Sequence, residues 1–220
     1  MSAFGYRKAQ DLPSVIPVFP LPQAILLPRS TLPLNIFEPR YLNMVDDALA
    51  GERLIGMIQP AFGQSVGAVP RLQDVGGVGR ITAFAETDDG RYLVTLTGVA
   101  RFRVVAEMEA PTPYRQVRAN FEPYAGDLTA PGLNSPIDRD RLSAALRQYV
   151  DVNGFDTDWS AVDSAPPEAL VHAIAALCPF DVPAKQALLE AETLSDRCTV
   201  LIALLELGTQ GPAASGGTLQ

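Results

Sequence analysis

Residues 19–49 read FPLPQAILLPRSTLPLNIFEPRYLNMVDDAL, and this stretch decides the order of the first structural elements. Prolines interrupt its first half, and each proline fixes φ and removes a backbone hydrogen-bond donor. The two apolar runs between the prolines, residues 24–27 and 32–37, are therefore predicted to form short or edge strands separated by bends.

A helix is predicted directly after these strands. Glu38 stands where an N-cap or first-turn carboxylate meets free amides, and Pro39 suits the first helical position. Apolar residues then recur at three- and four-residue spacing and give one buried face: Tyr41, Met44, Val45, Ala48 and Leu49. We interpret the phrase Phe37-Glu38-Pro39-Arg40-Tyr41 as structural, with a cap, a charge that holds a neighbouring loop and a half-buried ring.

This segment resembles the opening of the Lon N-terminal (substrate-binding) domain family. A second stretch, VGGVGRITAFAETDDGRYLVTLTGVARFRVV at 75–105, resembles the family's Gly-containing strand, D-G hairpin and following strand, and the similarity extends over about residues 15–207. The resemblance implies a PUA-like β pseudo-barrel in a stand-alone bacterial-type member. Many relatives carry His where this chain has Asn35, so a group that titrates near neutral pH is missing there, although an amide can still hydrogen-bond.

The spacing at which apolar residues recur differs between the first and second halves of the chain. Alternating residues predict strands at 53–59, 75–87, 91–99, 101–109 and 115–122, with a tight turn at Asp88-Asp89-Gly90. After a Pro- and Gly-rich stretch at 126–136, helices are predicted at 138–152 and 167–177, then one that starts at 181–183 and one capped by Ser195 that stops near Gly208. We therefore predict an α+β fold with a β-rich subdomain at 1–125, a helical bundle at 126–208 and a flexible tail at 209–220.

Charge is distributed unevenly along the chain. The 220 residues are 47% apolar and 19% charged, which is typical of a globular protein, and the net charge is −8. Residues 1–125 carry twelve basic and twelve acidic side chains, whereas residues 126–220 carry five basic and thirteen acidic ones. The acidic second half argues against nucleic acid and for basic partners.

The chain is expected to lie in the cytoplasm and not in a membrane. Its longest helical apolar run, residues 200–205, is far shorter than the ~20 residues that span a bilayer, and its N-terminus has no apolar signal region. Cys178 and Cys198 are interpreted as small core residues. A metal site that joins them to His172 is the alternative, but zinc ligands usually come in closely spaced pairs, so we expect no metal and no cofactor.

The candidate catalytic motifs lack the neighbouring residues or secondary structure that each of them requires. Neither Lys8 nor Lys185 completes a phosphate-binding loop or has a serine partner as in a Ser-Lys peptidase. Ser65 lies in a G-x-S-x-G pattern and precedes His172 as in α/β-hydrolases, but no helix is predicted after it, so a Gly-rich loop is favoured. Glycines 76, 77 and 79 do not complete a dinucleotide motif and favour a β-bulge or a sharp bend in the strand.

Two arginines form a candidate anion site. Arg101 and Arg103 flank Phe102, so alternation places both on one strand face. The patch could bind phosphate or an acidic peptide, or it could be a solvated face paired with glutamates such as Glu107. We favour the solvated face, because exposed cross-strand ion pairs are common.

The leading hypothesis is a non-catalytic module that recognises unfolded or extended polypeptide, with a protease or chaperone component as a further partner. Its expected peptide-binding residues, which lie on proline-interrupted strands and the 60–70 loop, are Pro28, Leu32, Leu34, Asn35 and Phe62. The alternatives are an RNA-binding PUA-like protein and a serine hydrolase that uses Ser65. The oligomeric state stays open.

Overall fold

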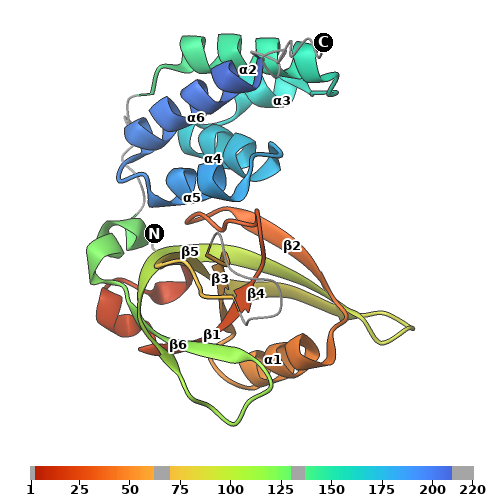
Figure 1. Cartoon of the computed structure of the whole chain (residues 1–220), viewed down its shortest axis with the longest axis vertical. Coiled ribbons are helices and arrows are strands. Elements are labelled where there is room, and N and C mark those ends of the chain that lie inside the picture. Colours follow the sequence, from red (N-terminus) through yellow and green to blue (C-terminus); the bar gives the residue numbers. More distant parts are fainter. Residues whose placement is uncertain (1–2, 62–69, 130–136, 210–220) are drawn as a thin grey trace, which may run out of the picture.

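The computed structural model describes residues 3–61, 70–129 and 137–209. Figure 1 shows a β-rich half with one helix on its side, and a helical half stacked on one end. The β-rich half contains β1 (Val15–Pro20), β2 (Thr31–Ile36), α1 (Pro39–Ala50), β3 (Leu54–Ile58), β4 (Val75–Glu86), β5 (Tyr92–Met108) and β6 (Arg115–Asn120). The helical half contains α2 (Arg139–Asn153), α3 (Trp159–Ser164), α4 (Pro167–Leu177), α5 (Val182–Glu190) and α6 (Leu194–Thr209). The predicted α+β class is confirmed.

The strands close into a barrel. Their order is β2-β5-β4-β3-β1-β6, and β5 pairs with β6 as well, so five strands form a ring and β2 is added outside it. The sequence predicted two strands over 91–109, but β5 is continuous. Residues 98–102 are buried without alternation, because the barrel interior covers one face of the strand there and the rest of the chain covers the other.

Residues 24–27 do not form the predicted strand. They cross the outer face of β4 and β5 at very short range: a Cβ added at Gly77 would lie 1.9 Å from the Leu26 carbonyl oxygen, and one at Gly98 would lie 2.0 Å from that of Leu27. Backbone hydrogen bonds from Arg29 to Gly98 and from Gly98 to Ser30, both 2.8 Å, hold the crossing. The predicted irregularity of the Gly-rich strand is present as a register shift between Val78 and Gly79.

The start of α1 differs from its sequence interpretation in detail. Pro39 opens the helix as predicted, and Glu38 occupies the N-cap position, but its side chain caps no backbone amide. Glu38 Oε2 instead accepts a hydrogen bond from Arg40 Nη2 at 2.8 Å, and the Arg40 guanidinium lies 4.5 Å from the centre of the Tyr41 ring. Tyr41 is buried rather than half-buried. Arg40 therefore holds its own helix start and not a neighbouring loop.

Two apolar clusters support the β-rich half. One fills the barrel around Phe102, Ile16, Val18 and Val117. The other lies between α1 and the sheet and includes Met44, Val45, Met57 and Leu96. The predicted buried face of α1 belongs to the second cluster, so amphipathic spacing identified the packing of this helix correctly.

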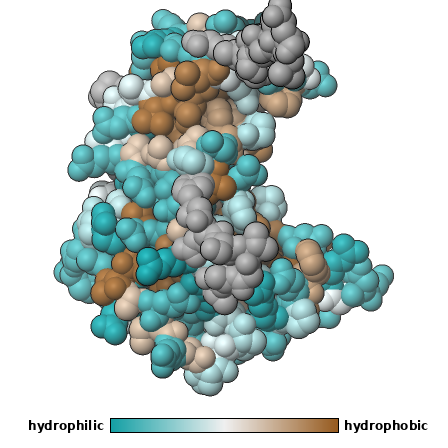
Figure 2. All heavy atoms as spheres, in the orientation of Figure 1, coloured by the Kyte–Doolittle hydropathy of each residue, from teal (hydrophilic) through white to brown (hydrophobic). Residues whose placement is uncertain are grey.

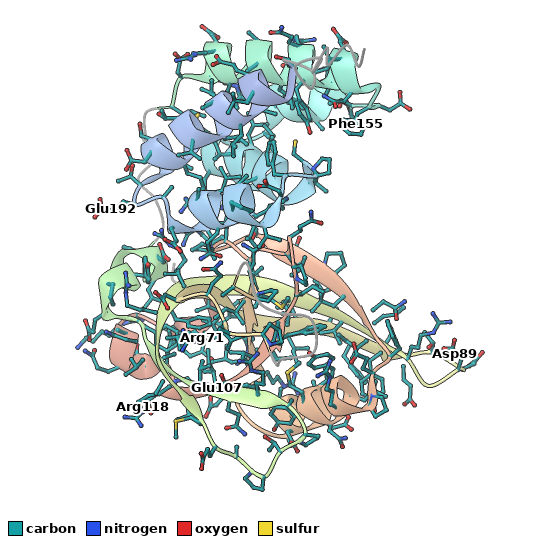
Figure 3. All side chains as sticks on the ribbon, in the orientation of Figure 1. Arg71, Asp89, Glu107, Arg118, Phe155 and Glu192 are labelled. Atoms are coloured by element: carbon teal, nitrogen blue, oxygen red, sulfur yellow. The ribbon has the colours of Figure 1, made fainter. Side chains whose placement is uncertain are left out.

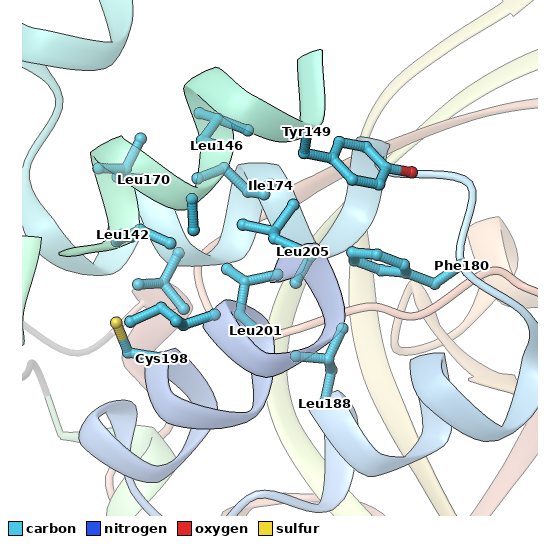
Figure 4. Packing of buried hydrophobic residues seen from close by; sticks show 14 of the residues in the cluster. Leu142, Leu146, Tyr149, Leu170, Ile174, Phe180, Leu188, Cys198, Leu201 and Leu205 are labelled. Atoms are coloured by element: carbon cyan, nitrogen blue, oxygen red, sulfur yellow. The ribbon is translucent and has the colours of Figure 1, made fainter. Parts of the chain in front are cut away.

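The helical half has its own apolar core, shown in Figure 4. Two helices match their predicted spans within one residue. Helix α3 was missed, because none of its six residues is buried and its apolar pattern gives no signal. The predicted Ser195 cap of α6 is wrong: Thr193 Oγ1 accepts from the Asp196 amide, and Asp196 Oδ2 accepts from the Thr193 amide, each at 3.1 Å.

Buried polar contacts join the two halves. Arg101 bonds both carboxylate oxygens of Asp127 at 2.9 Å, and its Nη1 also donates to the Ala191 carbonyl at 2.7 Å. Arg29 forms a bidentate pair with Glu168 of α4, at 2.9 and 2.6 Å. These charges are mostly shielded from water, so each depends on its partner.

Candidate peptide-binding site

Strand β2 is an edge strand. It pairs with β5 and with no other strand in the described ranges, with Pro33 opposite Thr95 and Asn35 opposite Leu93. Because Pro33 has no N–H, its pair with Thr95 lacks hydrogen bonds, and alternation along an antiparallel ladder then turns the backbone groups of Thr31 and Asn35 away from β5. This edge can accept another strand.

A shallow groove of about 430 Å³ adjoins this edge. Its lining comes from three neighbouring strands: Pro33, Leu34 and Asn35 of β2, Ala83, Phe84 and Ala85 of β4, and Leu93, Val94 and Thr95 of β5. No charged side chain is among these described residues. The groove therefore suits apolar side chains.

The groove lies on an arm that β4 and β5 extend beyond the barrel, with Asp89 at its tip (Figures 1 and 3). Apolar side chains interrupt the hydrophilic surface at the base of the arm in Figure 2. Leu93, on the same face as Asn35, is 47% exposed, which is high for a large apolar residue. Phe84 is 42% exposed, but its register opposite Val94 places it on the other face of the sheet. At the tip, hydrogen bonds from Arg91 and Thr87 lower the pKa of Asp89 to about 2, so the arm ends in a fixed carboxylate.

The structure brings together only part of the predicted binding set. Leu34 and Asn35 line the groove, and Leu32 is partly buried on the same strand. Pro28 is buried in the segment that crosses the sheet, away from the groove lining. Phe62 lies outside the described residues, as does most of the 60–70 loop.

The β5 and β4 residues of the groove were missed by the sequence interpretation. Leu93 occupies the face of β5 that otherwise carries Thr95 and Thr97, both polar. A large apolar residue on the polar face of an alternating strand was the available signal. It becomes informative only when the partner strand and the edge are known.

The predicted arginine patch does not form. Arg103 is exposed, but Arg101 has only 6% of its side chain exposed and is held by Asp127 and backbone carbonyls. The alternation failed because β5 is covered on both faces at this point. Neither an anion site nor a solvated face describes Arg101, and Glu107 pairs across the strands with Arg115 instead, at 2.6 Å.

His172 is buried, with 3% of its surface exposed, and is not the partly exposed residue that the sequence suggested. Arg197 Nη1 lies 3.3 Å from His172 Nε2, and the ring also hydrogen-bonds the Pro28 backbone. Burial and the nearby Arg197 charge lower the pKa of His172 to about 3. The imidazole therefore stays neutral and accepts from Arg197, so it is a structural group between the two halves.

Acid is therefore expected to weaken the protein through this single histidine. Between pH 6.5 and pH 3 the unfolded chain binds a proton that the folded chain does not, so stability falls as pH falls through this window. From pH 7.5 to pH 5, proton uptake at His172 in the unfolded chain should lower the free energy of unfolding by about 2 kcal/mol. Urea unfolding should show that His172→Gln, which keeps hydrogen-bonding groups, loses less stability over this interval than the natural chain. Parallel pH profiles would contradict the assignment.

Other reactive side chains are also held in structural roles. Lys185 is buried and donates to the carbonyls of Ala175 and Ala176 at 2.7 Å each, while burial lowers its pKa to about 8. Burial raises the pKa of Cys178 to about 11. Within residues 3–61, 70–129 and 137–209 no three His, Cys, Asp or Glu side chains gather as a metal site. Ser65 lies outside the described residues.

Over the described chain, no helix is long and apolar enough to cross a membrane. The two cysteines are unpaired, with Cys198 buried and Cys178 partly buried. Cys198 is packed in the core of the helical half, as the sequence predicted, and Cys178 packs against that core.

Comparisons with known proteins find relatives among Lon proteases. The chain is 26% identical to Lon protease 2 of Myxococcus xanthus over 214 residues, 93% of this chain and 25% of the relative, and 29% identical to Lon protease 2 of Sorangium cellulosum over 86% and 24%. It thus spans about a quarter of the length of these relatives.

Solved structures share the fold. The Lon N-terminal domain protein of Xanthomonas campestris superposes with a TM-score of 0.58 at 21% identity, covering 86% of this chain and 97% of that one. The N-terminal domain of the Mycobacterium avium complex Lon protease gives a TM-score of 0.60 at 17% identity, over 87% and 97%. Residues 15–206 match the ATP-dependent protease La (LON) substrate-binding domain, and the chain belongs to that family.

Proposed function

We propose that this protein binds unfolded or extended polypeptide at the edge of β2 and over the groove formed by β2, β5 and β4, without chemistry of its own. The observation that carries the proposal is the free edge of β2 beside an uncharged, apolar groove. A domain family described as substrate-binding supports a polypeptide as the ligand. The titratable groups described above support a non-catalytic role, because His172 and Lys185 are engaged in packing contacts.

The proposed complex is an added strand. The backbone N–H and C=O of Asn35 and Thr31 would pair with the peptide backbone, which gives affinity without sequence preference. Apolar side chains of the peptide would lie over Leu93, Ala83 and Ala85, which share the face of the sheet that carries Asn35. Affinity should then rise with apolar content and fall when backbone N–H groups of the peptide are methylated.

Replacing Leu93 with lysine is expected to weaken binding of unfolded casein about tenfold or more, because a charge would be buried under the bound strand. The matched control is Val105→Lys, which puts the same charge on an exposed apolar residue of β5 in the part that pairs with β6. Fluorescence anisotropy of labelled casein measures both. Equal affinities for the two variants would place the binding surface elsewhere.

Location and division of the chain are further parts of this proposal. A cytoplasmic location is supported by the unpaired cysteines, since a reducing compartment keeps thiols free.

We propose two subdomains, with the helical one beginning after Thr129 rather than at 126, because the short helix Glu122–Leu128 buries Leu128 in the barrel cluster. A protease or chaperone component remains the proposed second partner.

A further inference from the structure

A second apolar cleft, far larger than a single side chain, opens in the helical half. Its volume is about 620 Å³, and its walls are α2, α3, α4 and the connection between α2 and α3. Core residues form its floor: Leu146, Val150, Leu170 and Ile174. Figure 4 shows three of these packed together, and Phe155, at one end of the lining, projects from the side of the helical half in Figure 3.

The cleft exposes apolar surface that the described residues leave uncovered. Leu177 at the end of α4 is 82% exposed, and Phe155 is 45% exposed. Along α4 the exposed lining residues Ala169 and Ala173 precede Leu177 at four-residue spacing. This side of the cleft therefore has two small side chains followed by a large one at the end of the helix. Exposed apolar surface of this kind marks interaction sites.

The rim of the cleft is acidic. Asp156 and Asp158 line it, and both are exposed. Asp158 caps α3 through Oδ1, and hydrogen bonds from Ser160 and the Ala161 amide lower its pKa, so it is charged at neutral pH. Asp156 forms no hydrogen bond or ion pair with any residue that the structure describes. Residues 126–220 as a whole carry thirteen acidic and five basic side chains. This cleft therefore favours an occupant that is apolar on one face and basic beside it.

The walls decide the backbone conformation of the occupant. They are helices, whose backbone groups are bonded within each helix, so the cleft offers no strand edge. An extended peptide buried there would leave its own N–H and C=O groups unpaired, whereas a helix satisfies them internally. A second copy of this chain is disfavoured, because its net charge of −8 would face the acidic rim.

We propose that this cleft docks an amphipathic helix of a partner protein, with Lys or Arg beside its apolar face. From Ala169 to Leu177 the wall spans nine residues, or eight steps of ~1.5 Å that give about 12 Å, which matches anchors at positions i, i+4 and i+7 of the docked helix. The site is separate from the β2 edge. It does not depend on the peptide-binding function proposed above.

The test uses the whole chain and a labelled synthetic helix of about fourteen residues, with leucines at i, i+3, i+4 and i+7 and lysines beside them. A second peptide carries glutamate in place of each lysine. Anisotropy titrations should show saturable binding of the lysine peptide, weaker binding of the glutamate peptide by about tenfold or more, and loss of this difference at high salt.

Matched variants locate the contact. Ala173→Arg, inside the cleft, should reduce affinity for the lysine peptide about tenfold, whereas Ala176→Arg, exposed on the same helix outside the lining, should leave it unchanged. Asp156→Lys should lower affinity for the lysine peptide about two- to fivefold and raise that for the glutamate peptide. Circular dichroism confirms that each variant folds.

Several outcomes would overturn the proposal. These are no saturable binding of the lysine peptide, equal effects of Ala173→Arg and Ala176→Arg, or a concentration-dependent dimer, seen by sedimentation, that Ala173→Arg abolishes. Leu93→Lys should leave affinity for the lysine peptide unchanged while it weakens casein binding. This separates failure of the cleft from failure of the β2 edge.

Discussion

Gly77→Ala is expected to prevent the chain from folding, or to cost more than about 4 kcal/mol. The added Cβ would lie 1.9 Å from the Leu26 carbonyl oxygen and 3.0 Å from its carbonyl carbon. These are backbone atoms, so no rotamer change can relieve the contact. The segment would have to leave the sheet, and with it the buried residues Ile25, Leu26 and Leu27. Yield of soluble protein and urea unfolding measure the effect.

Gly126→Ala is the matched control. No atom lies within 4 Å of the Cβ that it would add, and its φ is not in the left-handed region, so it should change stability by less than about 0.5 kcal/mol. If Gly77→Ala proved as stable as Gly126→Ala, residues 24–27 would not lie against β4 as described.

Asp127→Ala is expected to cost about 3–5 kcal/mol, because it would leave the buried Arg101 guanidinium without its carboxylate. Only 6% of the Arg101 side chain and 11% of the Asp127 side chain are exposed, so solvent cannot replace the lost partner. The variant should also loosen the contact between the halves, since Arg101 donates to the Ala191 carbonyl beyond α5. Calorimetry and limited proteolysis measure the two effects.

The comparison is Asp163→Ala. Asp163 lies 3.8 Å from Arg147, and both side chains are at least half exposed, so its loss should cost less than about 0.5 kcal/mol. Equal melting temperatures for the two variants would mean that the buried pair of Arg101 with Asp127 adds no more to stability than the exposed pair of Arg147 with Asp163.

Local signals predicted much of the fold. The start of α1 at Pro39 and the spans of α2 and α4 followed from proline position and apolar spacing, because each of these helices buries one face. The barrel followed from the family resemblance and from alternation. The β4–β5 turn at Gly90, with φ of +78°, followed from its Asp-Asp-Gly sequence.

Features that depend on distant contacts were not predictable in the same way. Arg101 was predicted to be exposed because the alternating pattern reports only on the strand that contains it. Its burial depends on Asp127 and on the loop after α5. Gly77 looked like a bulge residue and Gly98 was not singled out, but both are explained by a crossing segment some fifty to seventy residues earlier in the chain. Such contacts leave no periodic trace in sequence.

The candidate site was predicted in part for the same reason. Prolines in 28–33 indicated an edge strand, which placed Leu34 and Asn35 at the groove. The residues opposite them, among them Leu93, depend on the register of β2 against β5, and no local pattern fixes that register. The cleft in the helical half depends on α3, which has no buried residue to reveal it.

Hydrogen exchange of the whole chain, with and without saturating unfolded casein, tests the central claim most directly. The edge amides of Thr31 and Asn35 face away from β5, so they should exchange quickly in the free protein and become protected when a peptide strand pairs with them. Protection centred on β2 and the neighbouring arm is the predicted result. Saturable casein binding that leaves the exchange of β2 unchanged would contradict the account.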